Sequence, residues 1–88
     1  MSVVKRFELS AKIVKNLKGE PTDEEKLKLY GLYKQSTIGN CNTPQPFVLS
    51  IKDNAKWKAW NYHNNKSSKD AMNEYSDFVV TLIHKYDV

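Results

Sequence analysis

Apolar residues in this sequence recur at steps of three and four, the spacing that places side chains on one face of an α-helix. The stripe is widest near the C-terminus, where it comprises Ala71, Met72, Tyr75, Phe78, Val79, Leu82, Ile83 and Tyr86. A shorter stripe near the N-terminus comprises Phe7, Ala11, Val14 and Leu17. No segment shows a convincing alternation with a period of two, so the spacing predicts an all-α protein.

Helix-capping residues define the first two predicted helices. The first helix is expected to end near the segment Gly19 to Pro21, where glycine and proline disfavour helix. Thr22 precedes the second helix, and Glu25 three residues later completes the pattern of a capping box. The apolar residues that follow extend the second predicted helix to Ile38.

A proline-containing loop separates the second predicted helix from the third. It starts at Gly39 and includes an apolar set that we expect to tuck under the bundle, namely Phe47, Val48, Leu49 and Ile51. Asp53 is expected to start a short third helix, which ends at a polar run from residue 61 to 66. Ser67 and Asp70 form the pattern of a second capping box, and the fourth helix follows.

The length of 88 residues predicts a single domain over 1–88 that folds as a four-helix bundle. A net charge of +4 favours an anionic partner, such as a phosphate-bearing ligand, nucleic acid or an acidic membrane surface. Cys41 is the only cysteine, which excludes an intramolecular disulfide and fits a reducing compartment. No stretch has the length and hydropathy of a signal peptide or a membrane span, so we expect a cytoplasmic protein without stable membrane insertion.

Residues that carry catalytic chemistry are scarce in this sequence. His63 and His84 have no companions at metal-ligand spacing, so no metal site is predicted. Cys41 has no histidine near it in sequence, and adjacent Glu24 and Glu25 point in different directions on a helix. The sequence therefore predicts no catalytic residue, no cofactor and no enzyme.

Tyrosines and lysines are combined at two places in the chain. Tyr30 and Lys34 lie four residues apart on the second predicted helix, on the face that also carries Leu27, and Tyr33 stands about 60° to one side. Lys56 stands beside a tryptophan in the third predicted helix. A core helix whose lysine reaches to water remains the simpler interpretation of the first group alone.

The spacing of these residues resembles that of the acyl-CoA-binding protein family. The resemblance extends from Phe7 to Tyr86 and is carried, in order, by Tyr30-x-x-Tyr33-Lys34-Gln35-Ser36-Thr37-x-Gly39, the loop with Asn42-Thr43 and Pro46, Lys56-Trp57-x-Ala59-Trp60-Asn61, and Ser67-x-x-Asp70-Ala71-Met72-x-x-Tyr75. Several aromatic and lysine positions that agree at fixed spacing make this a specific signal. The resemblance implies an up-down-down-up four-helix bundle that binds, protects and transports medium- to long-chain fatty acyl-CoA as a monomer in the cell.

The resemblance also implies roles for individual residues. Tyr30 and Lys34 would bind the phosphates of coenzyme A, and Lys56 would join Lys34 around the ribose 3′-phosphate. Tyr33 would pack against the adenine ring. The whole implied acyl-CoA site consists of Lys15 and Tyr75, which would close the head-group site, Leu27 and Leu29, which would contact the acyl chain, and Tyr30, Gly31, Leu32, Tyr33, Lys34 and Lys56. Trp60 is expected in the core, whereas Trp57 is open to either interpretation.

Several residues depart from the family pattern. Gly31 lies inside the second predicted helix, where it costs about 1 kcal/mol relative to alanine. Lys26 and Lys28 replace residues that are often apolar, and are expected to put charge near the groove for the acyl chain. Asn40 and Ser76 replace an acidic and an aliphatic residue, so helix packing near Ser76 is expected to be weaker.

Two alternatives from other functional classes remain open. A basic helical module could stack Tyr33 and Trp57 on the bases of a nucleic acid, but Arg6 is the only arginine and the lysines are spread over all four predicted helices. A protein-interaction bundle without a small ligand has no motif in its favour. It would leave the set of tyrosines and lysines unexplained.

Overall fold

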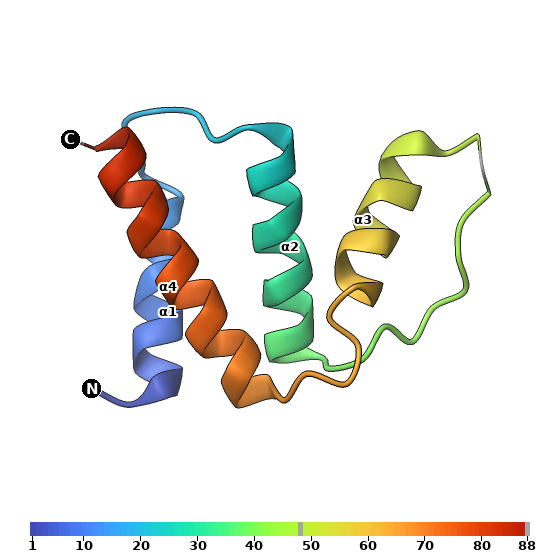
Figure 1. Cartoon of the computed structure of the whole chain (residues 1–88), viewed down its shortest axis with the longest axis horizontal. Coiled ribbons are helices and arrows are strands. Elements are labelled where there is room, and N and C mark those ends of the chain that lie inside the picture. The colour runs from blue at the N-terminus through green and yellow to red at the C-terminus, as the bar shows by residue number, and fades with distance from the viewer. Residues whose placement is uncertain (48, 88) are drawn as a thin grey trace.

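The computed structural model describes residues 1–47 and 49–87, and these residues form four helices and no strand. The helices are α1 (Val3–Val14), α2 (Asp23–Thr37), α3 (Ile51–Asn61) and α4 (Ser68–Tyr86). Helices α1 and α4 run in one direction, and α2 and α3 run in the other (Figure 1). The predicted all-α fold with an up-down-down-up order is therefore confirmed.

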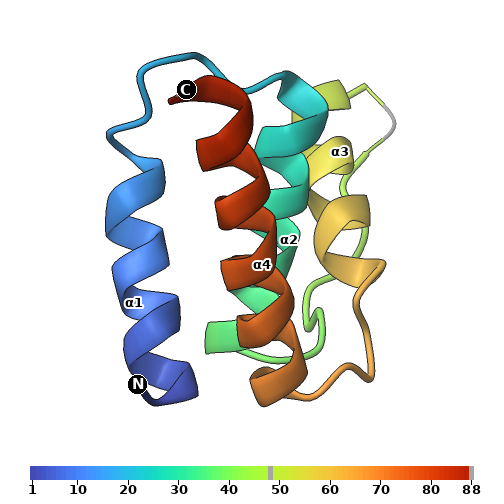
Figure 2. The ribbon, with the colours of Figure 1, turned by 60° about the vertical axis from the view of Figure 1, so that its left-hand side comes forward.

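Backbone contacts link the helices in the order α1, α4, α2 and α3. Helix α4 packs against α1 and α2, and α2 also packs against α3 (Figure 2). The molecule measures 39 × 27 × 15 Å along its principal axes. Because α2 and α3 are neighbours that run in the same direction, the chain between them has to return along the length of α3. The long loop predicted after Gly39 makes this return (Figure 1).

The core lies where α1, α2 and α4 meet. Phe7 of α1 stacks on Tyr33 of α2 with ring centroids 5.5 Å apart, and it meets Tyr75 of α4 edge-on at 5.0 Å. Leu32 and Val79 complete the buried cluster, and further apolar residues pack around it, namely Ala11, Val14, Leu29, Met72 and Ile83. The apolar stripes of α1 and α4 therefore pack on each other, and Phe7 adds a contact with α2.

Helix α1 ends earlier than the sequence predicted. Its last residue is Val14, whereas the expected end lay near Gly19. The N–H of Asn16 donates to the carbonyl of Ile13, and the Asn16 side-chain amide donates to the carbonyl of Lys12 at 3.2 Å. These bonds satisfy carbonyls that a continuing helix would have used, so the chain leaves the helix there. Helix α3, in contrast, is longer than predicted, since it begins at Ile51 rather than at Asp53.

The two predicted capping boxes have different outcomes. At the start of α2, the Thr22 hydroxyl accepts from the N–H of Glu25, and the Glu25 carboxylate accepts from the N–H of Thr22, so this capping box is confirmed. At the start of α4, the Ser67 hydroxyl accepts from the N–H of Asp70 at 3.0 Å. The structure describes no return bond from Asp70, whose side chain is one methylene shorter than that of glutamate. The second cap is therefore half of the predicted box.

Glu25 also joins the start of α2 to the end of α4. Its carboxylate accepts from the Lys85 ammonium at 2.9 Å and from the Tyr86 hydroxyl at 2.5 Å. The hydrogen bond from Tyr86, followed by those from Lys85 and the Thr22 N–H, lowers the pKa of Glu25 to about 2. A capping residue thus holds two helix ends together across the molecule.

Side-chain amides hold the opposite end of α2. The Gln35 amide donates to the side chain of Asn40 at 3.0 Å and to the carbonyl of Lys66 at 2.8 Å. The same Asn40 oxygen accepts from the N–H of Asn65, a residue with a φ of 73°. Asn40 therefore links the loop after α2 to the connection between α3 and α4.

Gly31 allows the backbones of α2 and α3 to approach closely. A Cβ atom at this position would lie 2.2 Å from the carbonyl oxygen of Ala59 and 2.7 Å from its carbonyl carbon. Both distances are shorter than any real contact, so only glycine fits this crossing. Gly31 lowers the helix propensity of α2, but it is required for the close packing of α2 on α3.

The apolar set in the long loop does not tuck under the bundle. Phe47, Leu49 and Ile51 are almost fully exposed, so the prediction was wrong for these residues. Val48, which belonged to the same predicted set, lies outside the described residues. The loop is held instead by the buried polar side chain of Asn54, whose amide donates to the carbonyls of Pro46 and Phe47. An amide anchor of this kind leaves the neighbouring side chains free to face solvent.

Candidate functional site

Tyr30 stands at the junction of three surface clefts on either side of α2. Two ammonium groups converge on it from different helices. The Nζ atom of Lys34, from α2, lies 5.9 Å from the centre of the Tyr30 ring, and the Nζ atom of Lys56, from α3, lies 5.4 Å from it. A hydroxyl and two cations therefore face the same small region, which suits a ligand with several phosphates.

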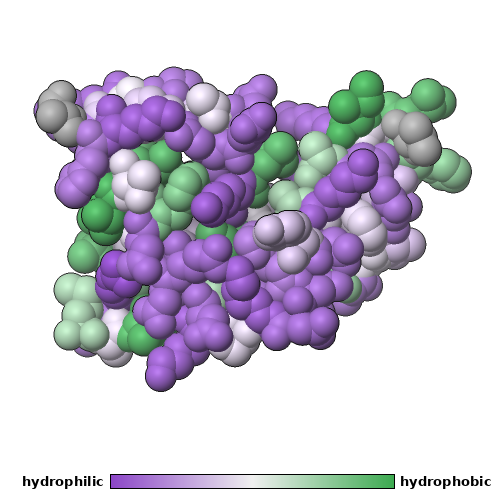
Figure 3. All heavy atoms as spheres, viewed as in Figure 1, coloured by the Kyte–Doolittle hydropathy of each residue, from purple (hydrophilic) through white to green (hydrophobic). Residues whose placement is uncertain are grey.

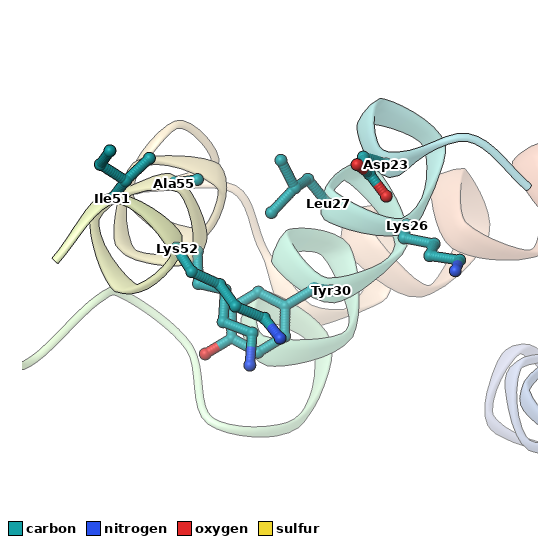
Figure 4. A pocket seen from close by; sticks show the side chains of 8 residues that line it. Asp23, Lys26, Leu27, Tyr30, Ile51, Lys52 and Ala55 are labelled. Carbon is teal, nitrogen blue, oxygen red and sulfur yellow. The ribbon is translucent and has the colours of Figure 1, made fainter.

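The largest of these three clefts lies between α2 and α3 and has a volume of about 720 Å³. Leu27 projects from α2 toward Ile51 and Ala55 on α3, and Lys52 extends beside Tyr30 (Figure 4). Asp23, Lys26 and Lys56 complete the lining. The cleft thus has an apolar floor and a charged mouth, an arrangement that fits a ligand with an aliphatic part and an anionic part.

A second cleft, of about 430 Å³, lies between α1, α2 and α4. Its aromatic side is formed by Tyr30, Tyr33 and Tyr75, with the rings of Tyr33 and Tyr75 6.1 Å apart. Burial, and then the neighbouring Tyr33, raises the pKa of Tyr75 to about 12. The rest of the lining consists of Ala11, Val14, Lys15, Lys26 and Leu29. Flat rings beside lysines favour a planar, anionic ligand group.

The third cleft, of about 340 Å³, contains both tryptophans together with Lys34 and Lys56. The indole N–H of Trp60 donates to the carbonyl of Gly39 at 2.7 Å, and that of Trp57 donates to the carbonyl of Thr43 at 2.8 Å. Trp60 is buried, as predicted, yet its ring also faces Lys34 at 4.9 Å. Trp57 is half-buried and pins the loop after α2 to α3.

The structure places most of the predicted site residues in the clefts around Tyr30. Two of them line no cleft, and two others lie in separate clefts. Gly31 and Leu32 are buried and line none of these clefts. The residues that do line them are Lys15, Leu27, Leu29, Tyr30, Tyr33, Lys34, Lys56 and Tyr75. Leu27 and Leu29, which were predicted to contact the same acyl chain, lie in different clefts on either side of α2.

The charged residues near the clefts differ from the prediction. Lys26 lines both larger clefts, as expected for a charge near the groove, and it forms an ion pair with Glu20. Lys28 lines neither of these clefts, because its ammonium lies 4.4 Å from the centre of the Phe78 ring on α4. Lys52 was missed, although it precedes Lys56 by four residues and so shares its helical face.

The histidine in the polar run after α3 is enclosed by neighbouring side chains. His63 is buried, its Nδ1 atom lies 3.1 Å from the ammonium of Lys66, and its ring edge is near Gly31. Burial, and then the charge of Lys66, lowers the pKa of His63. Within residues 1–47 and 49–87, no three His, Cys, Asp or Glu residues are grouped to hold a metal ion. The helices in these ranges are also too short or too polar to cross a membrane.

The sequence model of the Acyl CoA binding protein family matches residues 4–79, which is most of the chain. The chain belongs to the acyl-CoA-binding protein family. A relative in this family, the Acyl-CoA-binding protein homolog of Drosophila melanogaster, is 44% identical over 84 residues, which cover 96% of this chain and 98% of the relative. The Acyl-CoA-binding protein 2 of Saccharomyces pastorianus is 45% identical and covers 91% of this chain and 92% of its own length.

Solved structures of the acyl-CoA-binding protein family have the same fold. The crystal structure of Acyl-CoA-Binding Protein 2 from Oryza sativa superposes with a TM-score of 0.89 at 38% identity, over 96% of this chain and 93% of that one. The solution structure of the yeast protein superposes with a TM-score of 0.72 at 43% identity, over 93% of this chain and 95% of that one. Membership of this family gives no support to the nucleic-acid or protein-interaction alternatives.

Proposed function

We propose that this chain binds medium- to long-chain fatty acyl-CoA esters without covalent chemistry, shields them from water and carries them in the cytoplasm. Residues 1–88 would act as one binding domain, as a monomer, with acyl-CoA as a ligand and with no cofactor and no nucleic-acid partner. Relatives at 44% and 45% identity are named acyl-CoA-binding proteins, which supports the ligand class. The network around Tyr30 supports it independently.

The observation that carries the proposal is the convergence of Lys34 and Lys56 on Tyr30 at the meeting point of the clefts. Coenzyme A has a pyrophosphate and a ribose 3′-phosphate at its centre, an adenine ring at one end and an acyl thioester at the other. A central group of cations with an aromatic cleft on one side and an apolar cleft on the other matches this order. The phosphates would lie against the two lysines and the hydroxyl of Tyr30.

The two larger clefts suit the two ends of the ligand. We assign the acyl chain to the cleft between α2 and α3, where Leu27, Ile51 and Ala55 offer apolar surface. Each methylene buried there would contribute about 0.8 kcal/mol. We assign the adenine ring to the cleft between α1, α2 and α4, beside Tyr33 and Tyr75. This assignment moves Leu29 from the acyl chain to the nucleotide.

The 3′-phosphate provides the test, because it is the group that distinguishes coenzyme A from an ordinary adenine nucleotide. If Lys34 and Lys56 hold it, replacing either by alanine removes a charge-assisted bond and costs about 1.5 to 3 kcal/mol in binding. We expect palmitoyl-CoA to bind Lys34→Ala and Lys56→Ala roughly ten- to a hundredfold more weakly than wild type in calorimetric titrations. For the 3′-dephospho analogue, the same variants should show little of this penalty relative to wild type, because the phosphate that the lysine would bind is absent.

Lys69→Ala is the matched control, since Lys69 is exposed on α4 and lines none of the clefts. It should bind both ligands as wild type does. Equal penalties for both ligands in the Lys34 and Lys56 variants would show that these lysines serve the pyrophosphate or the general field instead. A random oligonucleotide titrated in parallel tests the nucleic-acid alternative, and tight binding to it with no response to palmitoyl-CoA would refute the proposed function.

A further inference from the structure

Three apolar side chains project from the molecule at the turn into α3. Phe47 is 88% exposed, Leu49 is 94% exposed and Ile51 is 80% exposed. We call these three residues the apolar tip, and Figure 3 shows the corresponding apolar surface at the end of the molecule near the start of α3. Single exposed apolar residues are ordinary, but three so close in sequence and so far out of the core mark an interaction surface.

Hydrogen bonds hold the backbone of the apolar tip in place. The buried Asn54 side chain donates to the carbonyl of Pro46 at 3.2 Å and to that of Phe47 at 2.5 Å, and it accepts from the Gln45 amide at 3.0 Å. The N–H of Ser50 donates to the carbonyl of Phe47 at 2.9 Å. These bonds involve backbone groups or residues outside the tip, so the turn is fixed without burying any tip side chain.

Lysines outnumber carboxylates in the two clefts that border the apolar tip, and Asp53, two residues after Ile51, is a further exposed carboxylate. Ile51 borders the cleft between α2 and α3 and a smaller neighbouring cleft of about 360 Å³. The charged residues that line these two clefts are one carboxylate, Asp23, and four lysines, Lys26, Lys52, Lys56 and Lys58. Of these lysines, Lys26 is paired with Glu20. An apolar projection with lysines behind it is the combination that binds an anionic lipid surface, where the side chains enter the interface and the lysines meet the headgroups.

We propose that the apolar tip docks reversibly on the surface of an anionic lipid bilayer. A stable protein dimer needs about 800 Å² of surface from each partner, which three side chains do not supply. A bilayer requires no such area from a single projection, since apolar insertion and lysine attraction are sufficient together. The contact is peripheral, because the described helices are unable to span the membrane.

Docking in this orientation would place the largest cleft at the lipid surface, because Ile51 belongs both to the tip and to the cleft lining. Leu27 and Ala55 continue the apolar surface from Ile51 into the cleft (Figure 4). This consequence rests on the proposed function: an acyl chain would pass from the bilayer interior to the cleft along continuous apolar surface, without crossing water. The docking itself does not depend on that function.

The experiment compares two double variants in vesicle flotation without ligand. Phe47→Ser with Leu49→Ser removes the part of the tip that lines none of the clefts. Val4→Ser with Leu9→Ser is the control, because these are exposed apolar residues of α1, on the far side of the molecule from α3. The vesicles contain phosphatidylcholine alone or an equal mixture with phosphatidylserine. Circular dichroism and thermal melting establish that both variants are folded.

We expect wild type and the Val4/Leu9 variant to float with the mixed vesicles and much less with phosphatidylcholine alone, and added salt should weaken the binding. The Phe47/Leu49 variant should bind the mixed vesicles on the order of tenfold more weakly. Calorimetric titration with palmitoyl-CoA in the absence of vesicles should give the same affinity for all three proteins, so the two proposals are tested separately.

Four results would overturn the docking proposal. The first is failure of wild type to bind either vesicle, and the second is binding of the Phe47/Leu49 variant as strong as that of wild type. Loss of palmitoyl-CoA binding in the Phe47/Leu49 variant would instead make the tip a part of the acyl-chain site. A wild-type dimer in analytical ultracentrifugation that the same variant abolishes would identify the tip as a contact between two copies of the chain.

Discussion

At the scale of single residues, the absence of a side chain at Gly31 sets the spacing between α2 and α3. A Cβ atom on Gly31 would come within 2.2 Å of the Ala59 carbonyl oxygen, which belongs to the backbone and cannot rotate away. The same helix crossing positions Lys56 beside Tyr30. Gly31 therefore supports the site by geometry, from a position that lines none of the clefts.

We expect Gly31→Ala to destabilise the protein. Alanine gains up to about 1 kcal/mol of helix propensity, but forcing the two helices apart costs about 1 to 3 kcal/mol when a backbone atom is in the way. With the full gain in propensity, the net loss in the free energy of unfolding, measured by urea denaturation, should be on the order of 1 kcal/mol. Palmitoyl-CoA should also bind more weakly, because Lys56 moves away from Tyr30. An unchanged or higher stability would mean that separating the helices costs no more than the helix propensity that alanine gains.

At the scale of helices, Glu25 serves two elements at once. It caps α2 through Thr22 and binds the end of α4 through Lys85 and Tyr86. These bonds require the ionised carboxylate and lower its pKa from 4.5 to about 2 in the folded protein. Because the folded pKa is lower than the unfolded one, the stabilisation is present above pH 4.5 and is lost as the pH falls toward 2.

Glu25→Gln tests this linkage, because glutamine keeps an oxygen for the N–H of Thr22 but does not titrate. The difference in unfolding free energy between wild type and Glu25→Gln should be largest above pH 4.5 and should shrink as the pH approaches 2. Glu24→Gln, at an exposed position one residue earlier, should leave the shape of the wild-type profile unchanged. A wild-type to Glu25→Gln difference that is constant over this range would contradict the role of the ionised carboxylate.

At the scale of the whole molecule, α2 divides the surface into two large clefts that meet at Tyr30 and Lys26. One cleft is mainly aliphatic and lies toward α3, and the other is mainly aromatic and lies toward α1 and α4. Leu27 and Leu29 mark the division, because each lines one cleft only. If the proposed function holds, the two leucines should affect ligand binding in different ways.

A series of saturated acyl-CoA ligands of increasing length tests the division. For wild type, affinity should rise by up to roughly fourfold for each buried methylene and then level off where the cleft ends. Leu27→Ala should reduce this rise, with little effect on butyryl-CoA. Leu29→Ala should weaken all chain lengths by a similar factor, because it acts on the nucleotide cleft. A flat response of wild type to chain length would show that the acyl chain is not buried.

The sequence by itself determined which segments are helical and which residues share a helical face. Capping by Thr22, the apolar stripe of α4 and the placement of Tyr30 and Lys34 together are local properties, since each residue of a helix advances by about 100°. The end of α1 was missed because one side-chain and one backbone hydrogen bond from Asn16 close the helix before the glycine that was expected to end it. The spacing of apolar residues does not reveal which hydrogen bonds end a helix.

Only the tertiary structure decided what the helices do together. Lys56 reaches Tyr30, and Leu27 and Leu29 separate into two clefts, because these relations depend on which faces of α2 meet which neighbours. The role of Gly31 depends on the backbone of α3, which lies against it only in the folded protein. The apolar tip was predicted to be buried because composition cannot distinguish an exposed phenylalanine such as Phe47 from a core one. Burial depends on whether another part of the chain covers a side chain, and that is fixed only when the helices pack.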